Sequence, residues 1–307
     1  MRIGFGLPVS GAWATPDRLA AVAVEAERAG YDALWSFQRL LVGVDQQLDP
    51  VYRSVLDPLI ALAYAAARTE SIRLGVAIVN LPFVTPAYLA KQVGTLDVLS
   101  GGRVDLGLGV GWSEPEFIAT GASADRRVAR TGEYVAALRT LWADEVSAFE
   151  GEFYTIPPSR MEPKPVQRPG PPILLGGGVP AALRRAGRIA DGWVSRSATD
   201  LSRIARDVEL VLAGAAEAGK DPATVRIVCR GVVRLSPVEP AGPDRRRLSG
   251  TFEQIREDAA WLATQGVTEV FYDLNWDPLL TGPGVDPSAT LDRALDILHG
   301  LSPAGLG

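Results

Sequence analysis

Short apolar runs alternate with amphipathic stretches along this 307-residue chain, and this alternation constrains its fold more than any other feature. The apolar runs have the length and β-branched content of buried strands, and the stretches between them carry apolar residues at helical spacing. The expected strands are Arg2–Leu7, Ala33–Ser36, Ile72–Val79, Val104–Leu108, Pro172–Leu175, Gly192–Ser195, Val225–Val233 and Glu269–Leu274. The expected helices lie near Pro16–Ala29, Val55–Thr69, Pro86–Leu99, Ala129–Ala143, Pro180–Ala190, Leu201–Ala218, Phe252–Gln265 and Ala289–Leu298.

Eight strands, each followed by a helix, predict an α/β fold that closes into a (β/α)8 TIM barrel. We expect residues 1–307 to form this one domain, with insertion loops after strands 4 and 7. The loops are the proline-rich segments Glu145–Pro171 and Ser236–Arg247, and loops of this length are usually lids, binding loops or oligomer contacts. An open doubly wound sheet is the alternative, but the glycine fingerprint that follows its first strand is missing.

Composition and charge narrow the classes of function. The net charge is −5 and no basic stretch extends beyond Arg245–Arg247, so we expect no nucleic-acid partner. The longest uncharged stretch, Leu74–Ala90, contains prolines and does not fit a membrane span. We expect the single cysteine, Cys229, to be a buried core thiol. We expect the single histidine, His299, to lie in the last turn of the last helix. We therefore expect a cytoplasmic protein with no metal and no membrane contact. We also expect a small-molecule substrate and assembly as a homodimer, neither of which follows from composition.

Glycines recur at every second position of the fourth expected strand. Gly107, Gly109 and Gly111 follow a helix that ends in a Ser-Gly-Gly turn, and all three lie on one face of the strand. Missing side chains let a flat ligand approach the backbone, and they equally allow tight packing or a bulge inside the barrel. The spacing does not match a dinucleotide fingerprint.

The motifs taken together resemble the bacterial luciferase-like monooxygenase family, in the branch that uses the deazaflavin coenzyme F420. The similarity spans nearly the whole chain and is most specific between Leu89 and Trp112. It is carried by Ile3–Gly6, Gly30–Trp35, Ser100–Arg103, Gly109–Trp112, Ile173–Gly178 and Ala190–Trp193. The resemblance implies a barrel with a flavin or deazaflavin lying across its mouth.

The same resemblance implies a set of cofactor-binding residues. Three glycines, Gly176–Gly178, precede a helix whose free N–H groups suit a phosphate, although a tight turn explains them equally well and the position follows strand five rather than strands seven or eight. Ser195 and Arg196 follow the next strand and are expected to add donors. The Ala77–Ile78 step aligns with a bulge that carries a cis peptide bond and supports the ring. Asn80 is expected either to reach the ring edge or to cap a turn, and Gly109, Val110 and Gly111 complete the set.

The chain departs from the family pattern after the second strand. Members that oxidise alcohols carry an Asp-His pair there, and this chain has Gln38 and Arg39. Neither is an effective base near neutral pH, so we expect a reductase rather than an alcohol dehydrogenase, with Gln38 and Arg39 orienting the cofactor or polarising a substrate oxygen. Glu114 is the candidate general acid, and Glu116 a weaker one, against the simpler interpretation of both as acids at a helix N-terminus.

Two other functions stay open. An FMN-dependent monooxygenase would keep the fold, but two-component members often place an arginine for the phosphate where this chain has Val110–Gly111. A non-enzymatic flavin-binding barrel is the alternative of another class. Three tryptophans, Trp13, Trp112 and Trp276, follow expected strands and either form an aromatic rim or pack in the core.

Overall fold

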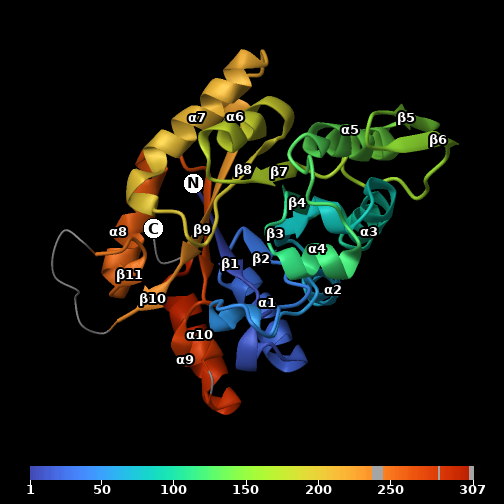
Figure 1. The fold of residues 1–307 in the computed structure, drawn as a ribbon. Coiled ribbons are helices and arrows are strands. Elements are labelled where there is room, and N and C mark those ends of the chain that lie inside the picture. Colours follow the sequence, from blue (N-terminus) through green and yellow to red (C-terminus); the bar gives the residue numbers. More distant parts are fainter. Residues whose placement is uncertain (237–244, 283, 304–307) are drawn as a thin grey trace.

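The computed structural model describes residues 1–236, 245–282 and 284–303, and it shows a closed barrel of parallel strands (Figure 1). The strands follow one another around the barrel in the order β1-β12-β9-β8-β7-β4-β3-β2. Their bounds are β1 (Arg2–Gly6), β2 (Ala33–Ser36), β3 (Arg73–Asn80), β4 (Val104–Gly109), β7 (Ile173–Gly176), β8 (Gly192–Val194), β9 (Arg226–Val232) and β12 (Glu269–Asp273). The predicted TIM barrel is confirmed, and the open sheet was the wrong alternative.

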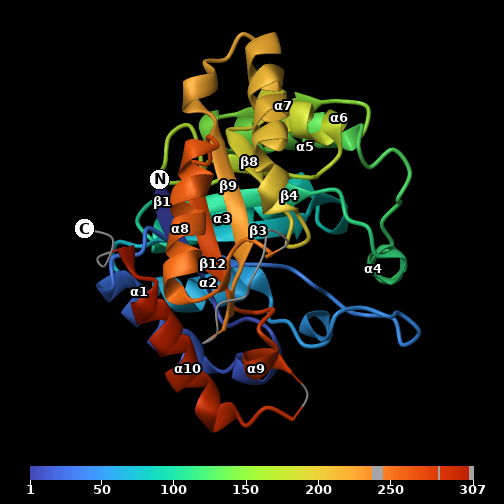
Figure 2. The same ribbon diagram turned by 90° about the vertical axis from the view of Figure 1, so that its left-hand side faces the viewer.

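Helices cover the outside of the barrel (Figure 2). They are α1 (Pro16–Arg28), α2 (Pro58–Ala66), α3 (Pro86–Leu99), α4 (Glu114–Thr120), α5 (Arg130–Ala143), α6 (Pro180–Ile189), α7 (Ile204–Glu217), α8 (Phe252–Thr264), α9 (Pro278–Thr281) and α10 (Pro287–Gly300). The short helices α4 and α9 were not predicted. Helix α2 begins later than expected because the Asp57 carboxylate accepts hydrogen bonds from the backbone N–H groups of Leu59 and Ile60 and so caps the helix there.

The first insertion is a hairpin rather than an irregular loop. Strands β5 (Ser147–Glu150) and β6 (Thr155–Ser159) pair in antiparallel fashion beyond α5 (Figure 1). A two-stranded ribbon tolerates the prolines of β6 because each strand is an edge strand. The chain then returns to the amino-terminal end of the barrel, where Gln167 Nε2 donates to the Val104 carbonyl at 2.8 Å. The chain after the hairpin is therefore anchored away from the carboxyl-terminal ends of the strands.

The second insertion is only partly described. Strands β10 (Arg234–Leu235) and β11 (Ser249–Gly250) pair at its two ends, and residues 237–244 of the predicted loop Ser236–Arg247 lie outside the described residues.

Aromatic rings fill the middle of the barrel. Trp35 stacks on Phe271 with ring centroids 5.1 Å apart, and both side chains are buried. Two glycines make room for them, since a Cβ at Gly75 would lie 2.4 Å from the Trp35 ring and a Cβ at Gly4 would lie 2.9 Å from Phe271 Cβ. The interior is thus closed at mid-height, as in other packed TIM barrels.

A layer of buried charge lies below these rings, at the amino-terminal end. Asp105 accepts hydrogen bonds from Arg73 and from Arg226, and Glu269 pairs with Arg226 and Arg2. Burial favours the neutral form of Asp105, but the hydrogen bonds and charges of Arg73 and Arg226 outweigh it and hold the pKa of Asp105 below its ordinary value. For Glu269 burial dominates and raises the pKa. This layer is a structural ion network.

The single cysteine and histidine lie where they were predicted. Cys229 is buried and free, and burial raises the pKa of its thiol to about 12. His299 lies in the last turn of α10, and the chain continues the helix through Gly300 to a C-cap at Leu301. Among the helices of the described residues, none is long and apolar enough to cross a membrane.

Candidate functional site

The bulge expected in the third strand is present. The Ala77–Ile78 peptide bond is cis, and the register between β3 and β4 shifts between Val76 and Val79. The resemblance had implied both features, and both are confirmed.

The glycines of β4 pack against this bulge. A Cβ at Gly107 would lie 2.3 Å from the Val76 carbonyl oxygen, and a Cβ at Gly109 would lie 2.6 Å from Ile78 Cδ1. Packing therefore already explains why these two positions are glycines. Gly111, at the end of the series, has a φ of +70° and lies against the Phe117 ring. Val110 is half-buried and uncharged, so it adds no positive charge to this turn.

Gln38 and Asn80 meet beside the bulge. The Gln38 side-chain oxygen accepts a hydrogen bond of 2.8 Å from the Asn80 backbone N–H. The Asn80 side chain makes no capping hydrogen bond to the turn that follows β3, although Asn80 occupies the N-cap position and is buried. Gln38 also lines a cavity of about 170 Å³ between the connections that follow β2 and β3. Gln38 thus fixes the backbone at the end of the bulged strand.

The triple-glycine turn after β7 lies beside an arginine. The guanidinium of Arg196 is so close to Gly178 that a Cβ there would be 2.5 Å from its Nη2 atom. Gly177 has a φ of +142°, and its carbonyl accepts a hydrogen bond of 2.9 Å from Trp193 Nε1. Helix α6 begins just after this turn and points its first N–H groups toward it. The turn, the helix start and an exposed guanidinium together form a site suited to an anion.

Ser195 takes a different position from Arg196. It is buried, and its hydroxyl accepts a hydrogen bond of 2.8 Å from the Arg230 backbone N–H. Ser195 therefore links β8 to β9, whereas Arg196 is exposed beside Gly178.

Arg39 forms a buried ion pair. Its Nη1 donates to Glu116 Oε2 at 2.7 Å, and the second oxygen of Glu116 accepts the Leu40 backbone N–H at 2.8 Å. The guanidinium also lies against the rings of Tyr52 and Trp112. The pair joins the loop after β2 to α4, and both segments project from the same side of the barrel in Figure 2. Arg39 therefore holds the loop after β2 against α4.

The two glutamates of α4 differ in burial, and the buried one is the residue that the sequence favoured less. Glu116, ranked second from the sequence, is buried and paired, while Glu114 is exposed in the first turn of α4. The placement of Glu114 matches that of an acid interacting with a helix N-terminus. Glu114 as a general acid stays a prediction.

Arg230, which sequence reasoning missed, lies at the centre of the carboxyl-terminal end. Its Nε donates to Asp273 Oδ2 at 2.7 Å, and its Nη1 donates to the Ala77 carbonyl of the cis peptide at 3.2 Å. The guanidinium lies 4.2 Å from the Trp276 ring centroid and 4.6 Å from that of Phe37. Arg230 thus touches the bulge directly, and its backbone is bonded to Ser195.

The comparisons with known proteins agree with this architecture. The family model described as luciferase-like monooxygenase matches residues 3–266. The chain belongs to this family.

The relatives of this luciferase-like chain have different cofactors in their names. It is 34% identical over 197 residues to an FMNH(2)-dependent dimethylsulfone monooxygenase of Pseudomonas putida, covering 63% of this chain and 52% of the relative. It is 31% identical over 226 residues to an F420-dependent hydroxymycolic acid dehydrogenase of Mycobacterium tuberculosis, covering 72% and 60%. The alignments to the first curated relatives span about half of their length. The crystal structure of monooxygenase RslO1 from Streptomyces bottropensis is similar over 100% of this chain and 99% of that chain, with a TM-score of 0.78 and 23% identity.

One signal in the luciferase-like sequence would have found Arg230. A charged residue in the middle of an otherwise apolar buried strand needs a partner and a reason, because burying an unpaired guanidinium is costly. The partner, Asp273, ends a strand that is adjacent in the barrel but 43 residues away in the chain.

The tryptophans had no such signal: Trp13 is buried in the core, while Trp112 and Trp276 lie at the carboxyl-terminal end.

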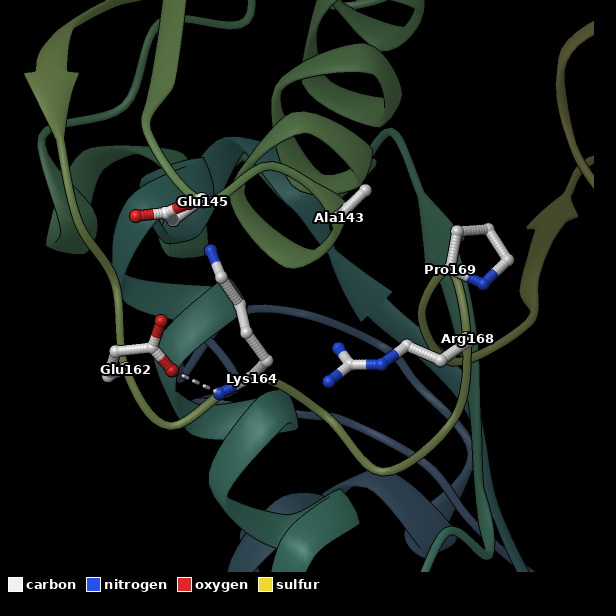
Figure 3. A pocket seen from close by; sticks show the side chains of 6 residues that line it. All are labelled: Ala143, Glu145, Glu162, Lys164, Arg168 and Pro169. Carbon is white, nitrogen blue, oxygen red and sulfur yellow. Dashed lines mark hydrogen bonds between the residues drawn. The ribbon is translucent and has the colours of Figure 1, made fainter.

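A larger cavity lies near the opposite end of the luciferase-like barrel. It measures about 590 Å³ and is bordered by the end of α5 and the chain after the hairpin. Lys164 binds the carbonyls of Leu141 and Asp144 there, and Arg168 extends toward Lys164 (Figure 3). The bulge and the glycine turn are at the other end. Within the described residues no cluster of His, Cys, Asp and Glu could hold a metal ion.

Proposed function

We propose that this protein transfers a hydride between coenzyme F420 and a small organic substrate, and that it acts as a reductase. The supporting observation is that the bulge at Ala77–Ile78 and the glycine turn beside Arg196 follow parallel strands and so lie at the same end of the barrel, where TIM-barrel enzymes have their active sites. By their names, relatives of this chain include an FMNH(2)-dependent monooxygenase and an F420-dependent dehydrogenase.

The residues present fit such a cofactor. The guanidinium of Arg196 beside Gly178 and the start of α6 would hold its phosphate, and the side chain of Ile78 next to Gly109 would support its ring. When bound, the deazaflavin supplies a carbon centre that carries a hydride. The chain's own residues orient this group and exclude water.

The residues after β2 support the direction of the reaction. An alcohol oxidation needs a base at this place, but the oxygen of Gln38 accepts the Asn80 N–H and Arg39 is paired with Glu116. A reduction needs a proton besides the hydride, and water can provide that proton. We therefore assign Gln38 and Arg39 to positioning rather than to proton transfer.

An FMN-dependent monooxygenase is the second candidate, because a relative 34% identical carries that activity in its name. Val110 and Gly111 place no arginine in the β4 turn, which favours the deazaflavin.

Equilibrium titration with F420 and FMN, followed by cofactor fluorescence, tests the proposal. We expect micromolar affinity for F420 and affinity at least about tenfold weaker for FMN, a difference of about 1.4 kcal/mol. Preference for FMN would replace the proposal with its rival. A cofactor that binds but exchanges no electrons with any acceptor would indicate a binding protein instead.

Arg196→Gln tests the anion site. Loss of a charge-assisted hydrogen bond should weaken cofactor binding about tenfold, with the melting temperature unchanged because Arg196 is exposed. Arg203→Gln, an exposed arginine in the turn before α7, is the matched control and should bind normally. Equal affinity of the two variants would remove Arg196 from the site. Gly177 is unsuitable for this test because a side chain there would meet Ala182 at 2.7 Å.

A further inference from the structure

Arg230 is nearly buried, yet its guanidinium is incompletely bonded. Only 8% of the residue is exposed. Its Nε binds Asp273 and its Nη1 binds the Ala77 carbonyl, while Nη2 donates to no residue that the structure describes. A buried guanidinium keeps five donor hydrogens, so the free amino group can still receive an acceptor.

The position of Arg230 explains where such an acceptor would come from. It lies beside the rings that close the barrel, since its register partner in β12 is Phe271 and its guanidinium lies 5.9 Å from the centroid of that ring. The groups around its guanidinium, Phe37, Trp276 and Asp273, come from the carboxyl-terminal ends of β2 and β12 or from the residues just after them. A ligand entering at this end reaches Arg230 before it reaches the closed core.

Stability alone does not account for the arginine. Replacing a buried ion pair with apolar residues of similar volume is often neutral or stabilising. The Asp273 carboxylate is also fully engaged, because its Oδ1 accepts the backbone and side-chain N–H groups of Asn275. Asp273 thus holds the guanidinium in place, in the way that a supporting group orients a binding residue.

Aromatic rings define the shape of the ligand. Phe37 and Trp276 lie in contact with each other, and Tyr52 packs edge-on against both. Trp276 is only partly buried, so part of its ring is open to a planar molecule, and the free guanidinium edge suits a carboxylate or a carbonyl oxygen.

We propose that Arg230 recognises the negatively polarised oxygen of a planar ligand at the carboxyl-terminal end of the barrel. The oxygen belongs either to the substrate, which would then be a conjugated carboxylate or carbonyl compound, or to the ring of the bound cofactor. The proposal rests on the proposed function for the identity of these ligands, and its first test uses the protein without cofactor.

The substrate arm compares benzoate with benzamide, which share a shape but differ in charge. We titrate cofactor-free protein with each at constant ionic strength and follow tryptophan fluorescence, to which Trp276 contributes beside Arg230. Benzoate should bind about tenfold more tightly than benzamide, because a bond between two charged groups is stronger. Arg230→Met should abolish this preference, and Arg230→Lys should retain part of it. A merely structural arginine would change both affinities equally.

The cofactor arm measures the affinity of the same variants for F420 and FMN. A loss of about tenfold in Arg230→Met, without a charge preference in the substrate arm, assigns the oxygen to the cofactor. If neither arm changes, Arg230 is structural and the proposal is overturned. Arg230→Met combined with Asp273→Asn removes both charges and keeps the test valid if the single variant unfolds. Failure of the proposed function is seen separately, as wild-type protein that binds neither cofactor.

Discussion

Asp105→Asn should lower the free energy of unfolding by about 3–5 kcal/mol, the typical cost of removing one partner from a buried ion pair. Asp105 is completely buried and pairs with both Arg73 and Arg226, so the substitution removes the carboxylate that they share and leaves Arg226 with Glu269 alone. Urea denaturation at pH 7 measures the loss. Asp292→Asn, on the exposed face of α10, is the matched control and should change stability by less than about 0.5 kcal/mol.

The pH dependence of this effect has a definite sign. The folded-state pKa of Asp105 lies below its unfolded value, so its carboxylate stabilises the fold fully above about pH 4 and ceases to do so as the pH falls through the folded pKa. The difference between wild type and Asp105→Asn should therefore be complete at pH 7 and shrink only in acid. A difference that shrinks already between pH 7 and pH 5 would contradict this account.

Glu116→Gln should be the second severe substitution, with a cost of about 3–5 kcal/mol, because it leaves the buried guanidinium of Arg39 without a counter-charge. The two loops that this pair joins should open, and hydrogen exchange should increase in residues 37–57 and in α4. Glu114→Gln is a matched control two residues away in the same helix, and because its side chain is exposed it should change stability by less than about 0.5 kcal/mol and leave exchange in the loop after β2 unchanged.

A double variant separates charge from packing at this site. Arg39→Met together with Glu116→Leu removes both charges and keeps apolar contacts with Tyr52 and Trp112, so it should recover most of the lost stability. If Glu116→Gln and Glu114→Gln behave alike, the ion pair does not hold these loops.

Local patterns in the sequence were enough to predict the barrel. Each barrel strand and each of the longer helices is visible in its own periodicity, and caps such as Thr251, which forms a capping box with Gln254, mark helix starts within a few residues. The hairpin β5–β6 was not predicted because its prolines are typical of a loop. Helix α4 was not predicted because it has only seven residues. The bulge at Ala77–Ile78 was predicted by resemblance alone, since no local pattern specifies a cis peptide.

The candidate site, too, was predicted from the sequence only in part. The glycine turn at Gly176–Gly178 and the residues after β2 could be found because each is contiguous in the chain. Tertiary structure decided that Glu116 rather than Glu114 is buried with Arg39, that Arg196 lies beside Gly178, and that Arg230 contacts both Asp273 and the bulge. Sequence determines which residues end each strand, but the closure of the barrel determines which of those ends face one another. A buried charged residue pairs with a residue from another strand of the closed barrel. The two can be far apart in the sequence, so local periodicity does not reveal the pair.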